Sequence, residues 1–313
     1  VPGLRINRTG TSGSGTGIVM NETNRADMLA VLERQRTAFT AARPEALSVR
    51  HDRLERCATL LKEHGEAFAK AMSADFGHRS HEQSMLTDIM PSVSIVRYSQ
   101  KRMKHWSRPE KRHVNFPLNL LGARAEVRYE PKGVIGIVAP WNFPVGLTMA
   151  PLAQAFAAGN RAMLKPSEFT ERTSELMQEL FPRYFAEEEV AVVTGGPETG
   201  QAFCGLPFDH LLFTGATPIG RHVLHAAADH LVPVTLELGG KSPTIFGRSA
   251  DIQRSAERVA LGKMMNAGQI CLAPDYLMVP EELEDRAIAA VAAGVSSMYP
   301  TLLANDDYTS VIN

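Results

Sequence analysis

Cys271 is the residue of this 313-residue chain best placed to act as a nucleophile. It ends the segment Gly268-Gln269-Ile270-Cys271, a short loop with a glycine and a polar residue. A thiol presented in such a loop attacks electrophiles if its pKa is lowered. A half-buried structural cysteine is the alternative. Cys57, by contrast, falls on an apolar helical stripe, which predicts a buried and inert thiol.

Glu237 is the candidate general base. It stands between two leucines in LELGGK, residues 236–241. Apolar neighbours predict desolvation, which would raise the pKa of the carboxyl group toward the range useful for a base. The two glycines that follow permit close approach of the backbone to a ligand. A simple ion pair between Glu237 and Lys241 is the alternative.

The segment KPSE, residues 165–168, offers a cation and an acceptor three positions apart. An ammonium and a carboxylate used together suit ribose hydroxyls, much as an acidic residue binds the ribose in dinucleotide folds. A helix start with a favourable acidic residue explains Lys165 and Glu168 equally well.

The segment FTGATPIG, residues 213–220, predicts a strand end, a turn and a helix start. We expect Thr217 to be the N-cap and Pro218 to occupy the first helical position. Free N–H groups at such a helix start would accept a phosphate. Neither a G-x-G-x-x-G fingerprint nor a P-loop occurs in the chain.

Five short apolar runs separated by helical patterns must position these residues. The expected strands are residues 134–139, 162–165, 190–193, 210–214 and 233–238. Near-continuous apolar strands alternating with helices predict an α/β fold with a parallel sheet covered on both faces. Polar residues fall at or just past the strand ends, where ligands bind in such sheets. They are Asn142, Lys165, Glu168, Gly215 and Glu237.

The rest of the chain carries less chemistry. Residues 25–105 predict helices, with a kink at Pro91, and residues 110–131 predict turns and an exposed strand. Residues 1–24 read as a flexible tail because they are rich in glycine, serine and threonine. Residues 133–160 carry no charge, but their prolines predict a strand, a loop and a short helix, not a membrane span.

Composition excludes several classes of protein. Thirty-three basic and 34 acidic residues give a net charge of -1, which argues against nucleic-acid binding. Three cysteines without a C-x-x-C pair predict a reducing compartment, the cytoplasm. His78 and His81 lie in a polar segment that favours exposure to solvent, and His222 and His225 share a helix face but have no third ligand nearby in sequence, so we expect no metal site.

Together the segments resemble the aldehyde dehydrogenase superfamily. Its motifs occur in the family's order and spacing as PWNFP (140–144), KPSE, FTGAT (213–217), LELGGK and GQIC. The five motifs in this order are specific for the family, although each motif alone is weak evidence. CLAPDY after residue 270 and PVTLELGGKSP resemble the class 3 branch, and most closely its coniferyl aldehyde dehydrogenase group. The resemblance covers residues 25–313.

The resemblance implies a role for each site residue. Cys271 would be the nucleophile, Asn142 and the Cys271 backbone N–H would stabilise the oxyanion, and Glu237 would activate the deacylating water. The implied cofactor is NAD, with NADP as the alternative. Its expected contacts are Trp141, Lys165, Ser167, Glu168, Gly215, Ala216, Thr217, Gly220, Leu238 and Gly239. The implied substrate is an aromatic aldehyde such as coniferyl aldehyde, or a medium- or long-chain aliphatic one.

The resemblance also implies a domain organisation. Residues 25–236 would form an NAD-binding domain, with 110–131 as an oligomerisation hairpin of a homodimer. Residues 237–313 would begin a catalytic domain, which we expect to be incomplete because the family continues beyond this point. Many relatives carry serine where this chain has Ala216, so backbone donors would have to hold the phosphate.

Two other functions remain open from the sequence. A CoA-acylating relative would pass the thioester to a thiol instead of water, but such relatives generally lack a carboxylate at the position of Glu237. An inactive scaffold would use the fold only as a binding surface. The presence of Cys271, Glu237 and Asn142 argues against the scaffold.

Overall fold

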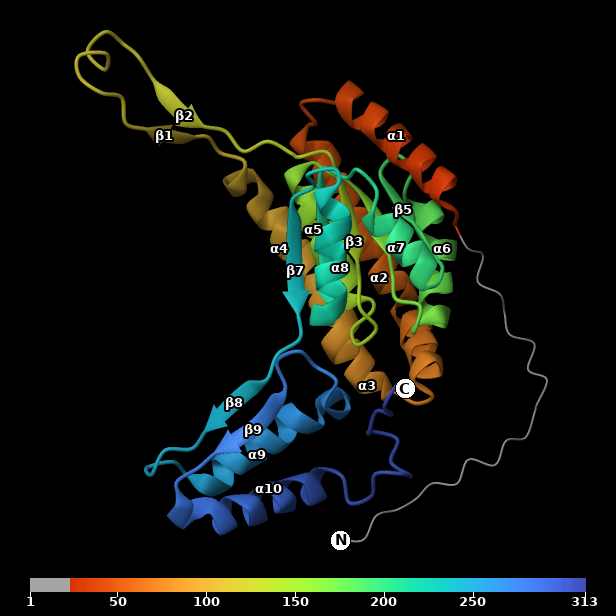
Figure 1. Ribbon diagram of the computed structural model, residues 1–313, viewed down its shortest axis with the longest axis vertical. Helices are drawn as coiled ribbons and strands as arrows, with labels where there is room; N and C mark the ends of the chain where they lie inside the picture. The colour runs from red at the N-terminus through yellow and green to blue at the C-terminus, as the bar shows by residue number, and fades with distance from the viewer. Residues whose placement is uncertain (1–22) are drawn as a thin grey trace, which may run out of the picture.

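A computed structural model describes residues 23–313 of the chain. The predicted tail, residues 1–24, lies outside the described residues except for its last two. The described part forms a large module built on a central sheet, a smaller module below it and a projecting two-stranded arm (Figure 1).

The central sheet has five parallel strands in the order β5-β4-β3-β6-β7. Their bounds are β3 Val134–Val138, β4 Arg161–Lys165, β5 Val190–Val192, β6 His210–Gly215 and β7 Val234–Leu238. Every predicted strand is confirmed to within one residue at each end. The chain starts in the middle at β3, runs outward to β5 and then returns to the other side of β3. The strand order therefore reverses between β3 and β6, and open α/β sheets bind ligands in the crevice at such a point.

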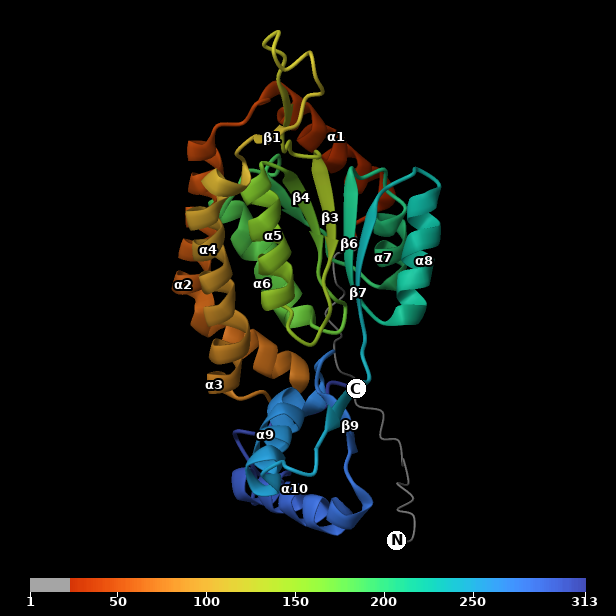
Figure 2. The same cartoon turned by 90° about the vertical axis from the view of Figure 1, so that its left-hand side faces the viewer.

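Helices cover both faces of this sheet, as predicted (Figure 2). One face carries α2 (Leu47–Phe76), α4 (Met90–Trp106), α5 (Gly146–Ala158) and α6 (Glu171–Tyr184). The other carries α1 (Arg25–Ala41), α7 (Pro197–Cys204) and α8 (Thr217–Ala228). Side chains of a strand alternate between the two resulting cores: Ile135 and Ile137 pack toward α2 and α5, and Val134 packs on the opposite face.

The predicted kink near Pro91 takes the form of a π-helical turn. Helix α3 (His81–Ser84) continues into this turn, Met85–Ile89, and α4 begins directly afterwards with Pro91 in its first turn. A proline near a helix start is tolerated because the N–H it lacks would have no intrahelical partner there. This π-helical turn is important for the site because it contains Asp88.

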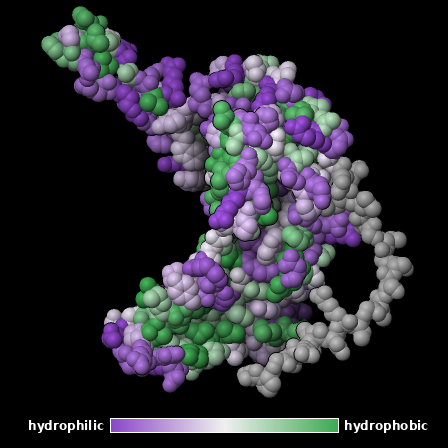
Figure 3. Space-filling view, in the orientation of Figure 1, coloured by the Kyte–Doolittle hydropathy of each residue, from purple (hydrophilic) through white to green (hydrophobic). Residues whose placement is uncertain are grey.

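Strands β1 (Glu110–Arg112) and β2 (Ala125–Val127) pair antiparallel and form the arm. The residues between them carry exposed apolar side chains at Phe116, Leu118, Leu120 and Leu121. The projecting tip shows as a mixed hydrophobic and hydrophilic knob in Figure 3.

The smaller module begins directly after β7. Its elements are β8 (Ser242–Ile245), α9 (Ile252–Met264), a 3₁₀ turn (Met265–Gly268), β9 (Pro274–Met278), a second turn (Glu281–Leu283) and α10 (Glu284–Met298). Strands β8 and β9 are parallel, and the module has its own core around Phe246 and Ile252. Strand β7 continues to Leu238, two residues beyond the division that the resemblance predicts.

The uncharged stretch 133–160 folds as β3, a loop and α5, as the prolines predict. Within residues 23–313, no helix combines the length and the apolar character needed to cross a membrane.

Candidate functional site

The register of the sheet places the predicted site segments at one edge. Val138 at the end of β3 lies opposite Lys165 on one side and Phe213 on the other. Gly215 at the end of β6 lies opposite Leu238 at the end of β7. The loops that carry Asn142, Glu168, Ala216 and Gly239 therefore all leave the sheet at its carboxyl edge, as predicted.

Asn142 joins this edge to the segment that carries Cys271. Its side-chain Nδ2 donates a hydrogen bond to the backbone oxygen of Gln269 at 3.0 Å, two positions before Cys271. Its Oδ1 accepts from the N–H of Phe143 at 3.2 Å, which orients the amide. A primary amide has two N–H groups, so a second donor remains for a ligand.

The three thiols differ in their surroundings. Cys57 is fully buried and Cys204 nearly so, whereas Cys271 is exposed. Burial raises the pKa of Cys57, which confirms the prediction of an inert thiol. Burial also raises the pKa of Cys204 to about 11, against the opposing effect of Lys165. Both buried thiols therefore stay protonated at neutral pH, and Cys271 is the thiol that a substrate can reach.

The glycines of LELGGK bring this segment against the Cys271 loop. A Cβ added at Gly240 would lie 2.6 Å from the backbone oxygen of Cys271, so only glycine allows this approach. Lys241 pairs with Asp275 at 3.0 Å, so the predicted alternative of a Glu237–Lys241 pair does not hold.

The expected desolvation of Glu237 is not found. Its side chain is exposed, and the half-buried residues of β7 are its neighbours Leu236 and Leu238. The physical reason is that β7 is an edge strand, whose leucines face the α8 side while Glu237 points to the opposite, uncovered face.

Three consecutive residues before Cys271 adopt left-handed backbone conformations. Their φ angles are 50° at Asn266, 52° at Ala267 and 76° at Gly268. The conformation at Ala267 costs roughly 1–2 kcal/mol, and such strain gathers at functional sites. Asn266 is held by Gln83, whose Oε1 accepts from the Asn266 N–H and whose Nε2 donates to Asn266 Oδ1, both at 3.0 Å. Sequence reasoning missed this strained turn.

Lys165 and Glu168 lie at the end of β4, as predicted. The Lys165 ammonium is buried, donates to the backbone oxygen of Pro166 at 2.8 Å and lies 3.9 Å from the Glu168 carboxylate. Burial lowers the pKa of Lys165, and Glu168 partly opposes that effect. The turn is fixed by Ser167, whose Oγ accepts from the Phe169 N–H and whose backbone oxygen accepts from Ser174.

The start of α8 is open to an anion. The N-cap is Ala216, not Thr217 as predicted, and Thr217 is instead the first helical residue. Because an alanine side chain has no acceptor, the first N–H groups of α8 have no side-chain cap. Such groups, together with the helix dipole, bind phosphate. Gly220 lets α8 pack closely on β7, since a Cβ there would lie 2.8 Å from Leu238 Cδ2.

Asp75 at the end of α2 is a second residue that sequence reasoning missed. Its carboxylate accepts hydrogen bonds from the backbone N–H groups of Arg172 at 2.8 Å and Thr173 at 3.0 Å. Burial raises the pKa of Asp75, and the bonds from Thr173 and Arg172 oppose the shift. Asp75 thereby caps α6 from another helix and fixes the backbone that follows Glu168. Trp141 contacts the neighbouring ring of Phe76 at a centroid distance of 6.3 Å.

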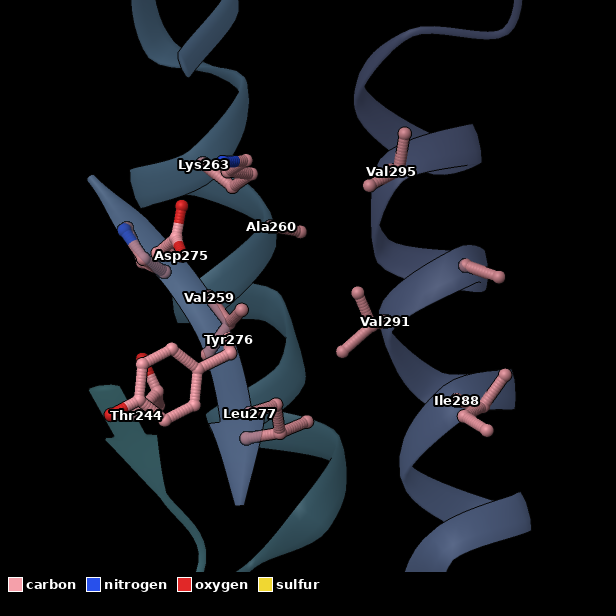
Figure 4. A pocket seen from close by; sticks show the side chains of 12 residues that line it. Thr244, Val259, Ala260, Lys263, Asp275, Tyr276, Leu277, Ile288, Val291 and Val295 are labelled. Atoms are coloured by element: carbon pink, nitrogen blue, oxygen red, sulfur yellow. The ribbon is translucent and has the colours of Figure 1, made fainter. Parts of the chain in front are cut away.

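A cavity of about 370 Å³ lies elsewhere, in the smaller module between α9, β9 and α10. Figure 4 shows apolar side chains such as Val259, Leu277 and Val291 along its walls. None of the residues predicted for the site lines it. No group of three or more potential metal ligands lies close together in the described part of the chain.

An open parallel sheet with an uncapped helix start and a Lys–Glu pair at its carboxyl edge is typical of nucleotide-binding α/β proteins, and here an exposed cysteine lies beside that edge. The sequence profile of the Aldehyde dehydrogenase family matches residues 14–309. This chain belongs to that family.

The similar proteins agree with this assignment. The chain is 51% identical over 294 residues to a probable coniferyl aldehyde dehydrogenase of Caulobacter vibrioides, and 52% identical over 284 residues to a coniferyl aldehyde dehydrogenase of a Pseudomonas species. These alignments cover 93% and 91% of this chain but 60% and 58% of the relatives. A substrate-bound AldH structure of Staphylococcus aureus matches with a TM-score of 0.86 at 32% identity, over 91% of this chain and 62% of that one.

A second solved structure has its cofactor named. The NAD+ complex of an aldehyde dehydrogenase from Bacillus cereus matches with a TM-score of 0.79 at 28% identity, over 90% of this chain and 56% of that one. The chain thus spans about 60% of the length of the curated relatives it matches.

Proposed function

We propose that this chain supplies the cofactor site and the nucleophile of an NAD-dependent aldehyde dehydrogenase, which oxidises an aldehyde to the carboxylic acid. The hydrogen bond between Asn142 and Gln269 carries the proposal, because it brings an oxyanion donor to the loop of an exposed thiol. The two relatives named as coniferyl aldehyde dehydrogenases favour an aromatic aldehyde as substrate.

The residues present fit the cofactor. Uncapped N–H groups at Ala216 to Thr217 and the close packing at Gly220 suit a pyrophosphate, and the Lys165–Glu168 pair suits ribose hydroxyls. We assign Trp141, Ser167, Gly215, Leu238 and Gly239 to the same site because they border these loops.

The chemistry begins when the Cys271 thiolate attacks the aldehyde carbon. A C–S bond forms, and the carbonyl π electrons move to the oxygen. One amide N–H of Asn142 and the backbone N–H of Cys271 donate to this oxyanion, and each such donor contributes roughly 3–4 kcal/mol in comparable sites. NAD bound at this site would supply the two-electron acceptor for the aldehydic hydrogen and its electron pair.

The product of this step is a thioester on Cys271. Glu237 accepts a proton from a water molecule as the water attacks the acyl carbon, the C–S bond breaks, and the acid leaves. Glu237 is exposed and forms no ion pair within residues 23–313, so its carboxylate is free to move to a water. A CoA-acylating enzyme would need no such base.

Rapid mixing with coniferyl aldehyde and NAD tests these roles. We expect Cys271→Ala to abolish NADH formation while NAD binding persists. Glu237→Gln should give a burst of about one NADH per active site followed by slow turnover, which a small external thiol restores. Turnover by Glu237→Gln at the wild-type rate, or a wild type that requires the thiol, would contradict hydrolysis by Glu237.

We also propose that the arm, residues 110–131, joins two copies of this chain. Its tip exposes Phe116, Leu120 and Leu121 by 77%, 74% and 79%, away from both cores. Apolar side chains clustered on a projecting arm are typical of a contact surface.

The three cysteines are free thiols, which supports a reducing compartment, the cytoplasm.

A further inference from the structure

A fully buried ion pair lies behind the loop that carries Asn142. Arg79 Nη2 donates to Asp88 Oδ2 at 2.7 Å, and both side chains are 0% exposed. The guanidinium lies over the rings of Phe76 and Phe143, at 5.0 and 5.3 Å from their centroids. A buried ion pair by itself is weak evidence for stability, because desolvation offsets its attraction. The hydrogen bonds that the pair makes to backbone groups, and not its charge, therefore indicate its role.

Both members of the pair bind the backbone of the segment that runs from Asn142 to the start of α5. Arg79 Nη1 donates to the backbone oxygen of Asn142 at 3.0 Å. Asp88 Oδ1 accepts from the N–H of Gly146 at 2.6 Å. The pair thus holds this segment at two points four residues apart, Asn142 in the loop and Gly146 at the start of α5.

A third contact ties the same carbonyl to the Cys271 segment. Asn266 Nδ2 donates to the backbone oxygen of Asn142 at 3.1 Å, beside the bond from Arg79. With this carbonyl fixed from both sides and the amide bound to Gln269, the side chain of Asn142 keeps one orientation.

Another buried arginine on the same part of the chain lacks such contacts. Arg53 in α2 is as buried as Arg79 and binds the carboxylates of Glu45 and Glu189. Neither of these ion pairs joins Arg53 to a loop of the candidate site. Burial of an arginine in this fold therefore does not by itself imply a link to the site.

We propose that the Arg79–Asp88 pair positions the amide of Asn142 toward the oxygen of an aldehyde on Cys271. The inference rests on the proposed function, in which Asn142 stabilises the oxyanion. Arg79 and Asp88 touch no reacting atom, so they are positioning residues. A displacement of about 1 Å in such a site lowers turnover roughly a hundredfold.

Arg79→Lys is the variant that tests the proposal, with Arg53→Lys as the matched control. A lysine keeps the charge beside Asp88 but cannot also reach the Asn142 carbonyl in the same fork geometry. We expect kcat to fall by about tenfold to a hundredfold with KM changed by less than about threefold. Arg53→Lys should leave kcat within about twofold of the wild type. This should hold even if Arg53→Lys lowers the thermal midpoint of unfolding as much as Arg79→Lys does.

Two further measurements separate positioning from a purely structural role. In an Asn142→Ala background, Arg79→Lys should cause little additional loss of kcat, because its effect passes through Asn142. The double variant Arg79→Met/Asp88→Leu removes the pair without leaving a buried charge, and should lower kcat in a chain that still folds. Additive losses of kcat from Asn142→Ala and Arg79→Lys would overturn the proposal.

Hydrogen exchange of residues 140–149 gives a readout that needs no activity. Arg79→Lys should raise the exchange rate of this loop by about tenfold, and Arg53→Lys should not. Unchanged exchange in Arg79→Lys overturns the inference alone. If instead Asn142→Ala keeps full kcat, the proposed function of Asn142 fails first.

Discussion

Replacing Gly240 by alanine should displace the Cys271 loop. The new Cβ would lie 2.6 Å from the backbone oxygen of Cys271, inside the 3.0 Å that real Cβ atoms respect. The carbonyl must therefore move by at least about 0.4 Å, the difference between these two distances. Because the contact is with backbone and not with a flexible side chain, we expect a loss of roughly 1–3 kcal/mol in the free energy of unfolding, as for other overpacked sites.

Gly239→Ala is the matched control, one residue away. No heavy atom lies within 4 Å of a Cβ added at Gly239, and neither glycine has a positive φ, so alanine is conformationally acceptable at both. Gly239→Ala should be neutral or stabilise by up to about 1 kcal/mol.

Urea denaturation and the alkylation rate of Cys271 by iodoacetamide check this prediction. Gly240→Ala should lower the urea midpoint and change the alkylation rate by about threefold or more, whereas Gly239→Ala should keep the wild-type alkylation rate and a urea midpoint no lower than that of the wild type. Equal midpoints for the two variants would refute the close packing of LELGGK against Cys271.

Three further predictions concern charged side chains. Burial raises the pKa of Glu189, but hydrogen bonds from Arg56 and Arg53 outweigh it and hold the value at about 2, below the ordinary 4.5. Glu189 therefore stabilises the fold above pH 4.5, and Glu189→Gln should cost up to about 3 kcal/mol at pH 7, a difference that shrinks as the pH falls toward 2. Glu55→Gln, at a more exposed pair, should cost less. Glu168→Gln removes the charge that opposes a 2′-phosphate, so the ratio of kcat/KM for NADP over NAD should rise by about tenfold, and an unchanged ratio would exclude Glu168 from ribose binding.

The sheet could be predicted from sequence because its signals are local. Short apolar runs such as 134–139, with glycine and proline at their ends, are typical of buried strands. The position of the candidate site segments could be predicted for the same reason, since polar residues directly after a buried strand must lie at the carboxyl edge of the sheet.

Features that depend on distant partners could not be predicted in this way. Arg79 sits in a polar segment of the sequence, and only the fold shows that it is buried against Asp88 and the Asn142 loop. Ala267 gives no local signal for a left-handed conformation, and the neighbouring Asn266 is held by Gln83, which is distant in sequence. The exposure of Glu237 follows from the place of β7 at the sheet edge, which periodicity does not reveal.

The contacts that hold the Cys271 segment span much of the chain, and this has a consequence for folding kinetics. Asn142 and Gln269 are separated by 127 positions, and Gln83 and Asn266 by 183. Contacts of such long sequence separation close large loops, so they form late relative to local helices. During synthesis Gln83 and Asn142 emerge before Cys271. The thiol therefore reaches its place only after the sheet has formed. Until then Asn142 is not yet held beside the exposed thiol of Cys271, so the site should assemble after the sheet during refolding.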